Sequence, residues 1–236
     1  MTESFNASEL NATDTGTVNR NLNKIIAIAS GLVAVNILLM LAMSYVPPIV
    51  GLSAILFGNV FVGMAVFAIT VGGGFWISSK GTESGNLPLA GAGVSLTQLG
   101  YGLFGALILG VAPAALRLPA IGISVVLTAI VTAIITFVVF NTDRNFSSWQ
   151  SYSFYCFIAG FAVVAVGYFT TPLVMAIGGF IFFVAFVVDL TYEIWAVKAN
   201  RYASDLRNAI GIYVAVMGVF IHILQWVIRI LSMLSE

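Results

Sequence analysis

Long apolar stretches, separated by short polar breaks, make up almost the whole chain after residue 24. Charged side chains are so sparse there that they leave five uncharged stretches, at 25–79, 84–116, 118–142, 145–188 and 208–228. A helix that crosses the hydrocarbon core of a bilayer needs about 20 predominantly apolar residues, and each stretch is at least that long. The pattern therefore predicts a protein embedded in a membrane.

Two of these stretches are long enough for two spans, and each has a break near its middle. Pro47-Pro48 interrupts the first, and Thr170-Thr171-Pro172 interrupts the fourth. Proline ends helices because it lacks a backbone N–H and clashes with the preceding turn. The sequence thus predicts an all-α membrane protein with seven transmembrane helices, near 25–46, 50–79, 90–116, 119–141, 149–170, 172–195 and 208–233. A membrane β-barrel is excluded, because its strands would alternate apolar and polar residues.

Composition supports the membrane class and removes several others. The chain is 60% hydrophobic and 8% charged, whereas a soluble domain is about 25% charged. This excludes a soluble enzyme, a nucleic-acid-binding protein and a disordered scaffold. Cys156 is the only cysteine, which excludes a disulfide framework and a cysteine-based metal site. We expect residues 1–24 to form a polar cytoplasmic tail and residues 25–236 to form the transmembrane domain.

The placement of lysine and arginine predicts how the helices are oriented. Two basic residues, Arg117 and Arg229, fall on one side of the expected bundle. Cytoplasmic loops carry an excess of basic residues, so the side with more of them is expected to be cytoplasmic. This predicts a multi-pass protein of the cell membrane with its N-terminus in the cytoplasm and its C-terminus outside. Seven basic residues fall on the cytoplasmic side, namely Arg20, Lys24, Lys80, Arg144, Lys198, Arg201 and Arg207.

Ionisable residues inside spans point to function, because each is costly in lipid unless it faces a polar interior. In the helix expected over 172–195, Asp189 shares a helical stripe with the small residues Gly178 and Ala185. We therefore interpret Asp189 as a residue of an ion pathway or gate that faces a neighbouring helix. The alternative is that Asp189 simply ends the apolar span at the headgroups. Glu193, one turn further along, is expected at the membrane interface and is a second candidate for the pathway.

The helix expected over 208–233 has one small and polar face. The members of this face are Gly211, Ala215, Gly218, His222, Gln225 and Arg229. We expect this face to point into the bundle, with Gly211, Ala215 and Gly218 as packing residues, and the bulky opposite face to point toward lipid or outer packing. The bulky residues are Val216, Phe220, Ile223 and Val227. His222 lies near mid-membrane, either as a pathway residue or as a hydrogen-bonded packing residue.

The motifs of common enzymes and metal sites are missing from the sequence. There is no second histidine to complete a transition-metal site. No nucleophile–base pair, glycine-rich phosphate loop or HExxH motif occurs either. We therefore expect neither an enzyme nor a bound cofactor.

Three stretches resemble the Bax inhibitor-1 (transmembrane Bax inhibitor motif) family. They are the helix around 128–137 with the loop 141–147, the segment Val188-Asp189-Leu190-Thr191, and the helix start over 208–220. The resemblance implies a seven-helix fold with the seventh helix at its centre. It also implies a calcium leak that is gated by a proton-sensitive pair of aspartates, one on helix 6 and one on helix 7.

This chain departs from that family at the acid pair. Asp189 matches the helix 6 aspartate, but Ala215 stands where the resemblance places the helix 7 aspartate, and Gly218 where it places an asparagine. The di-acid sensor is therefore incomplete. A lone buried Asp189 would be neutral through desolvation, or ionised if His222 or Arg207 approached it. A cation would find one carboxylate, backbone carbonyls and Asn59, which is few ligands for calcium.

Three functions follow as hypotheses. The first is an ion leak of the Bax inhibitor-1 class, with a cation as the transported partner. The second is a non-conducting membrane protein that modulates a membrane protease or another complex, which the incomplete acid pair favours. The third, a secondary transporter, is disfavoured because the sequence has no visible internal repeat. The lipid bilayer is the common partner in all three.

Overall fold

The computed structural model describes residues 21–235, so most of the expected tail over 1–24, with Arg20, lies outside the described residues. The first helix begins at Leu22, three residues before the expected start. Asn21 fixes this boundary, because its side-chain oxygen accepts a hydrogen bond from the Lys24 N–H at 3.0 Å. Asparagine is among the preferred residues at this capping position.

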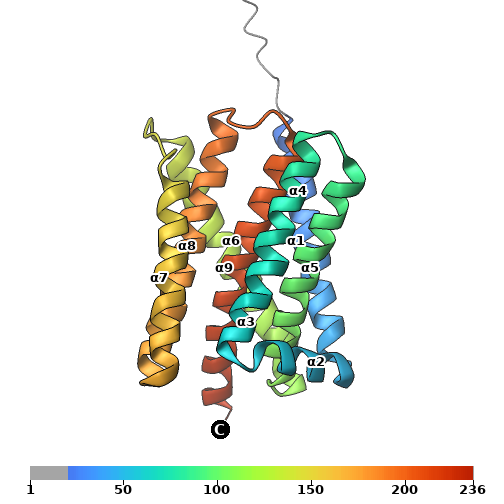
Figure 1. Cartoon of the computed structure of the whole chain (residues 1–236), viewed down its shortest axis with the longest axis vertical. Coiled ribbons are helices and arrows are strands. Elements are labelled where there is room, and N and C mark those ends of the chain that lie inside the picture. The colour runs from blue at the N-terminus through green and yellow to red at the C-terminus, as the bar shows by residue number, and fades with distance from the viewer. Residues whose placement is uncertain (1–20, 236) are drawn as a thin grey trace, which may run out of the picture.

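Seven helical spans make up the described part of the chain, as the sequence predicts, and it contains no strand (Figure 1). Each is long and apolar enough to cross a bilayer. Six are single helices: α1 (Leu22–Ser44), α5 (Leu87–Gly110), α6 (Ala114–Phe140), α7 (Trp149–Phe169), α8 (Pro172–Lys198) and α9 (Asp205–Leu234). The second span is composite and consists of α3 (Val60–Phe67), the π-helical turn η1 (Ala68–Gly73) and α4 (Gly74–Glu83).

The region expected to be one helix over 50–79 contains a break. The short helix α2 (Pro47–Phe57) precedes the span and lies across one end of the bundle (Figure 1). Its two prolines occupy the first turn, where their missing N–H groups cost nothing. The helix begins again after Asn59, which caps it: the Asn59 side-chain oxygen accepts hydrogen bonds from the N–H groups of Phe61 and Val62. This uncharged break is invisible to a count of charges.

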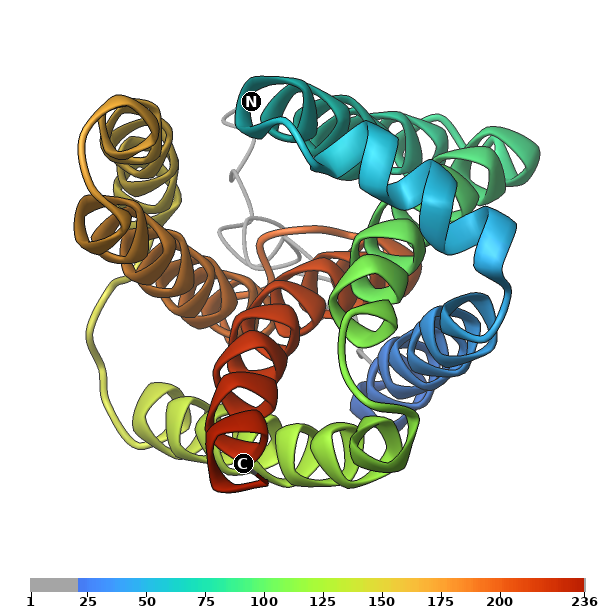
Figure 2. The same ribbon diagram turned by 90° about the horizontal axis from the view of Figure 1, so that it is seen from below.

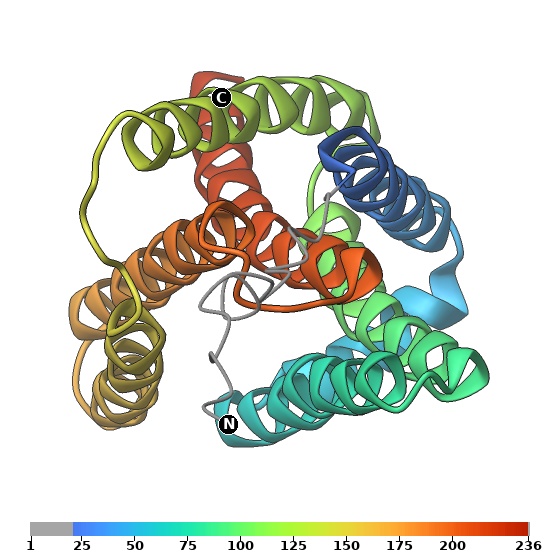
Figure 3. The ribbon, with the colours of Figure 1, turned by 90° about the horizontal axis from the view of Figure 1, so that it is seen from above.

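Helix α9 runs through the centre of the bundle, as Figures 2 and 3 show from the two ends. It packs against α1, α4, α5, α6 and α8, whereas α7 packs mainly on α8. Its bulky face is therefore covered as well as its small face: Phe220 and Ile223 are buried along with Ala215. The expectation of one inward face is too narrow, because a central helix has neighbours on nearly every side.

Small residues let the helices approach closely at several crossings. A Cβ atom added to Gly218 of α9 would collide with the ring of Phe186 on α8. In the same way, a Cβ on Gly81 of α4 would meet the backbone of Ala90 on α5. Such contacts are how membrane helices gain packing without a hydrophobic driving force between them.

The two ends of the bundle differ in charge. The N-terminal end holds the start of α1 and the α4–α5, α6–α7 and α8–α9 connections (Figure 1). At the opposite end, Arg117 joins three segments, because its guanidinium donates to the backbone oxygens of Ser44, Gly110 and Ala112. The described basic residues at the N-terminal end are Lys24, Lys80, Arg144, Lys198, Arg201 and Arg207.

Candidate functional site

A buried ion pair joins α8 to α9 near the N-terminal end. The Arg207 guanidinium donates to both carboxylate oxygens of Glu193, at 2.8 and 3.1 Å. The two side chains are only 5% and 3% exposed. A bidentate pair of this kind is among the stronger charge-assisted hydrogen-bonding arrangements. We expected Glu193 at the membrane interface; the structure shows that α9 covers its carboxylate, and its depth in the bilayer stays a prediction.

The tight α8–α9 connection sets this pairing. Asn200 turns the chain with a φ of 53°, a left-handed conformation that asparagine tolerates better than most residues. Ser204 then caps α9, accepting a hydrogen bond from the Arg207 N–H at 3.3 Å. The two helices run back antiparallel, so Glu193 and Arg207 face one another across the hairpin.

Two aromatic rings pack on the Arg207 guanidinium, and a glycine leaves room for it. Its guanidinium carbon lies 3.9 Å from the ring centre of Tyr202 and 4.8 Å from that of Phe75 on α4. Guanidinium groups stack favourably on aromatic faces. A Cβ atom on Gly211 would run into the Glu193 carboxylate and the Arg207 guanidinium. Gly211 therefore leaves the space that the ion pair occupies.

Asp189 lies one turn before Glu193 on the same helix and is partly buried. It interacts with Ser153 of α7, and Glu193 and Arg207 are near enough to act on it electrostatically. Two carboxylates and one guanidinium thus share this region. Arg207 bonds Glu193 directly, and no described basic side chain forms a salt bridge with Asp189.

Uncharged polar groups continue the cluster toward α1 and α5. The Tyr101 hydroxyl of α5 donates to the Val214 carbonyl of α9 at 2.8 Å. The Tyr213 hydroxyl donates to the Asn36 side-chain oxygen at 3.4 Å, and the Asn36 amide donates to the Gln98 carbonyl at 2.9 Å. These bonds satisfy polar groups deep in the apolar core, where an unpaired group is costly.

The other candidate residues do not join this cluster. His222 lies about four turns after Arg207 on α9. Its Nδ1 is 2.8 Å from the Gly218 carbonyl oxygen, and its ring packs near Phe182 and Phe186. Asn59 caps α3 at the end of the bundle opposite the α8–α9 connection (Figure 1). Ala215 is fully buried in α9.

The sequence pointed to both acids, and to Arg207 and Gly211, but did not place Arg207 and Gly211 beside Glu193. Arg207 appeared only as a conditional partner of Asp189, whereas it bonds Glu193. The signal for that pair was the short turn between two long helices, which brings positions before and after it together. Tyr101, Tyr213 and Asn36 gave no signal, because uncharged polar residues do not interrupt a hydrophobic span. Among residues 21–235 no group of three or more histidine, cysteine or acidic side chains is placed to hold a metal ion.

Comparison of the chain with protein-family models, with curated proteins and with solved structures gives no match.

Proposed function

We propose that this protein lets cations leak across a cell membrane, with Asp189 lining the path near the cytoplasmic face. The observation that carries the proposal is the second acid: Glu193 bonds Arg207 directly, whereas no basic side chain among the described residues forms a salt bridge with Asp189. An ionisable group inside a span is a candidate for an ion pathway by default. The resemblance to the Bax inhibitor-1 family implies the same activity.

The orientation in the proposal follows from charge. Arg117 and Arg229 lie toward the end of the bundle opposite the N-terminus, and the other described basic residues lie toward the N-terminal end. Because basic residues concentrate on the cytoplasmic side, we place the N-terminus in the cytoplasm and the C-terminus outside. Asp189 then lies next to the cytoplasmic third of its helix.

In this mechanism the two acids have different roles. The Glu193–Arg207 pair fastens α8 to α9, and a cation meets Asp189 with the hydroxyls of Ser153 and Tyr101 nearby. Calcium takes six to eight oxygen ligands, far more than one carboxylate supplies. Passage therefore depends on water and backbone carbonyls as well as on Asp189, which suits a weak leak rather than a tight binding site.

The experiment is cation flux into proteoliposomes, measured separately for calcium and potassium. We expect Asp189→Asn to reduce the flux several-fold. Asp143→Asn is the matched control, because Asp143 is exposed in the loop before α7 and should leave the flux unchanged. Equal flux from wild type and Asp189→Asn would remove Asp189 from the path.

A second candidate function is a non-conducting protein that regulates a membrane protease or another complex. The contacts of Arg207 favour this function, because a guanidinium that is bonded to Glu193 and stacked on two rings resists rearrangement. Liposomes containing the wild-type protein would then show no more flux than empty liposomes. A stoichiometric membrane-protein partner would instead co-purify from a mild detergent extract.

A further inference from the structure

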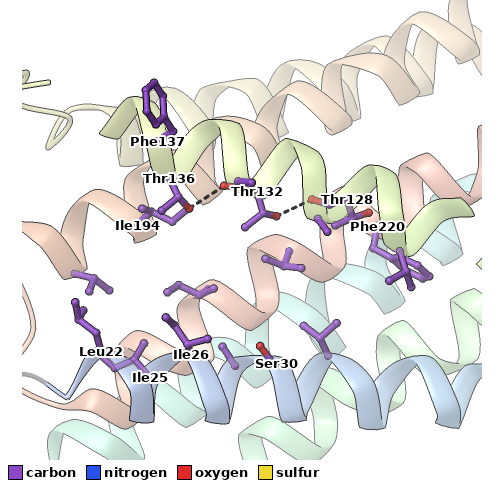
Figure 4. Close-up of a pocket in the computed structure, with 18 of the residues that line it drawn as sticks. Leu22, Ile25, Ile26, Ser30, Thr128, Thr132, Thr136, Phe137, Ile194 and Phe220 are labelled. Atoms are coloured by element: carbon purple, nitrogen blue, oxygen red, sulfur yellow. Dashed lines mark hydrogen bonds between the residues drawn. The ribbon is translucent and has the colours of Figure 1, made fainter. Parts of the chain in front are cut away.

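A groove opens between α1 and α6 and exposes the central helix to the surrounding membrane (Figure 4). Both helices pack on α9, but they stand apart from one another over this length. The walls are Leu22 to Ile37 on α1 and Val125 to Phe140 on α6, and Ile212, Val216 and Phe220 of α9 form part of the floor. The groove has a volume of 880 Å³.

The surface of this groove is almost entirely hydrocarbon. The Thr132 and Thr136 hydroxyls each donate to the backbone carbonyl one turn earlier, at 2.8 Å, as the dashed lines in Figure 4 show. Their hydrogen-bonding needs are thus met within α6. The groove lies within the spans, so hydrocarbon rather than water is the solvent that meets it.

The groove is long enough to hold an acyl chain that lies along it. Its walls are sixteen residues each, and the fifteen steps of about 1.5 Å between their ends give a length of about 22 Å. One leaflet is half of a hydrocarbon core of about 30 Å, so the groove is longer than one leaflet is thick.

Basic residues stand at the N-terminal mouth of the groove. Lys24 is 58% exposed and pairs loosely with Asp205, at 3.6 Å. Lys198 reaches the end of α6, where its ammonium donates to the carbonyls of Val139, Phe140 and Thr142 at 3.0, 3.4 and 2.6 Å. In the described part of the chain no carboxylate forms a salt bridge with Lys198. The mouth therefore attracts anions.

We propose that the groove binds one acyl chain of an anionic glycerophospholipid, with the headgroup at Lys24 and Lys198 and the chain lying on α9. The apolar lining and the length of the groove suit the chain, and the two ammonium groups attract the headgroup. The lipid would complete the ring of helices around α9 on the side where α1 and α6 stand apart. This proposal is independent of ion flux.

The test uses native mass spectrometry of the full chain after exchange into mixed dioleoyl phosphatidylglycerol and dioleoyl phosphatidylcholine. We expect one retained phosphatidylglycerol per wild-type chain. Ala133→Trp fills the groove and should reduce retention at least tenfold. Ile134→Trp is the matched control, because Ile134 is 58% exposed on α6 outside the groove and should retain the lipid.

Two further variants keep the proposal falsifiable if Ala133→Trp does not fold. Lys24→Gln and Lys198→Gln should each lower the preference for phosphatidylglycerol over phosphatidylcholine by about fivefold. Wild-type protein that retains both lipids equally, or neither, overturns the proposal, as does undiminished retention by a folded Ala133→Trp. A dimer that Ala133→Trp abolishes also overturns it, because the groove would then hold a second copy of the chain.

Discussion

Replacing Arg207 with glutamine leaves the Glu193 carboxylate buried without its ionic partner. Removing one member of a buried ion pair costs about 3–5 kcal/mol, because the remaining charge stays in a medium that solvates it poorly. The two hydrogen bonds are 2.8 and 3.1 Å long and both side chains are at most 5% exposed, so solvent does not compensate. For a chain of this size, each kcal/mol lowers the melting temperature by about 2–4 °C. We therefore expect Arg207→Gln to melt about 6–20 °C below wild type.

The assay is the fraction of monodisperse protein that remains after heating in detergent, read by size-exclusion chromatography. Lys80→Gln is the control, since it breaks the salt bridge with Glu83, in which the side chains are 57% and 53% exposed. Exposed pairs contribute about 0–1 kcal/mol, so this variant should melt at most about 4 °C below wild type.

The double variant Glu193→Gln/Arg207→Gln separates the loss of the pair from the cost of an unpaired charge. With neither charge present, we expect it to melt above the single variant Arg207→Gln, because neutral amides are cheaper to bury than a lone carboxylate. If Arg207→Gln melts at the same temperature as Lys80→Gln, or if the double variant melts at the lowest temperature, the Glu193–Arg207 pair does not stabilise the contact between α8 and α9.

Two more predictions concern packing and topology. Gly218→Ala should lower the melting temperature, because the new methyl group meets the Phe186 ring. Gly179→Ala is the control and should not lower it, because nothing lies within 4 Å of the added Cβ. Equal effects of the two variants would contradict the assigned packing. In a Cys156→Ala background, Ser235→Cys should react with an impermeant thiol reagent in whole cells, and protection of that cysteine would reverse the proposed orientation.

The seven spans follow from the sequence because charges and prolines mark the ends of membrane helices more clearly than periodicity does. The break between α2 and α3 does not, because Gly58 and Asn59 are uncharged and interrupt hydropathy only slightly. The central place of α9 was expected from its small face and from the family resemblance. The burial of its bulky face was not, since a helical wheel shows polarity and not the number of neighbours.

The candidate site was half visible in the sequence. Asp189 and Glu193 stand out as acids in an apolar run, but the depth of Glu193 depends on where α9 begins and on the partner that Arg207 supplies. A pattern along one helix cannot reveal that Gly211 leaves space for the ion pair between Glu193 and Arg207. Contacts between residues of different helices therefore could not be predicted from the sequence.

The central position of α9 has a consequence for the order of biosynthesis. Proteins emerge from the ribosome N-terminus first, so the helices that pack against α9 are made before it. Until then, the sides of α1, α4, α5, α6 and α8 that later contact α9 face lipid, water or one another. Insertion of the individual spans can precede assembly in membranes. Glu193 therefore gains its ionic partner only after Arg207 and the start of α9 have been made.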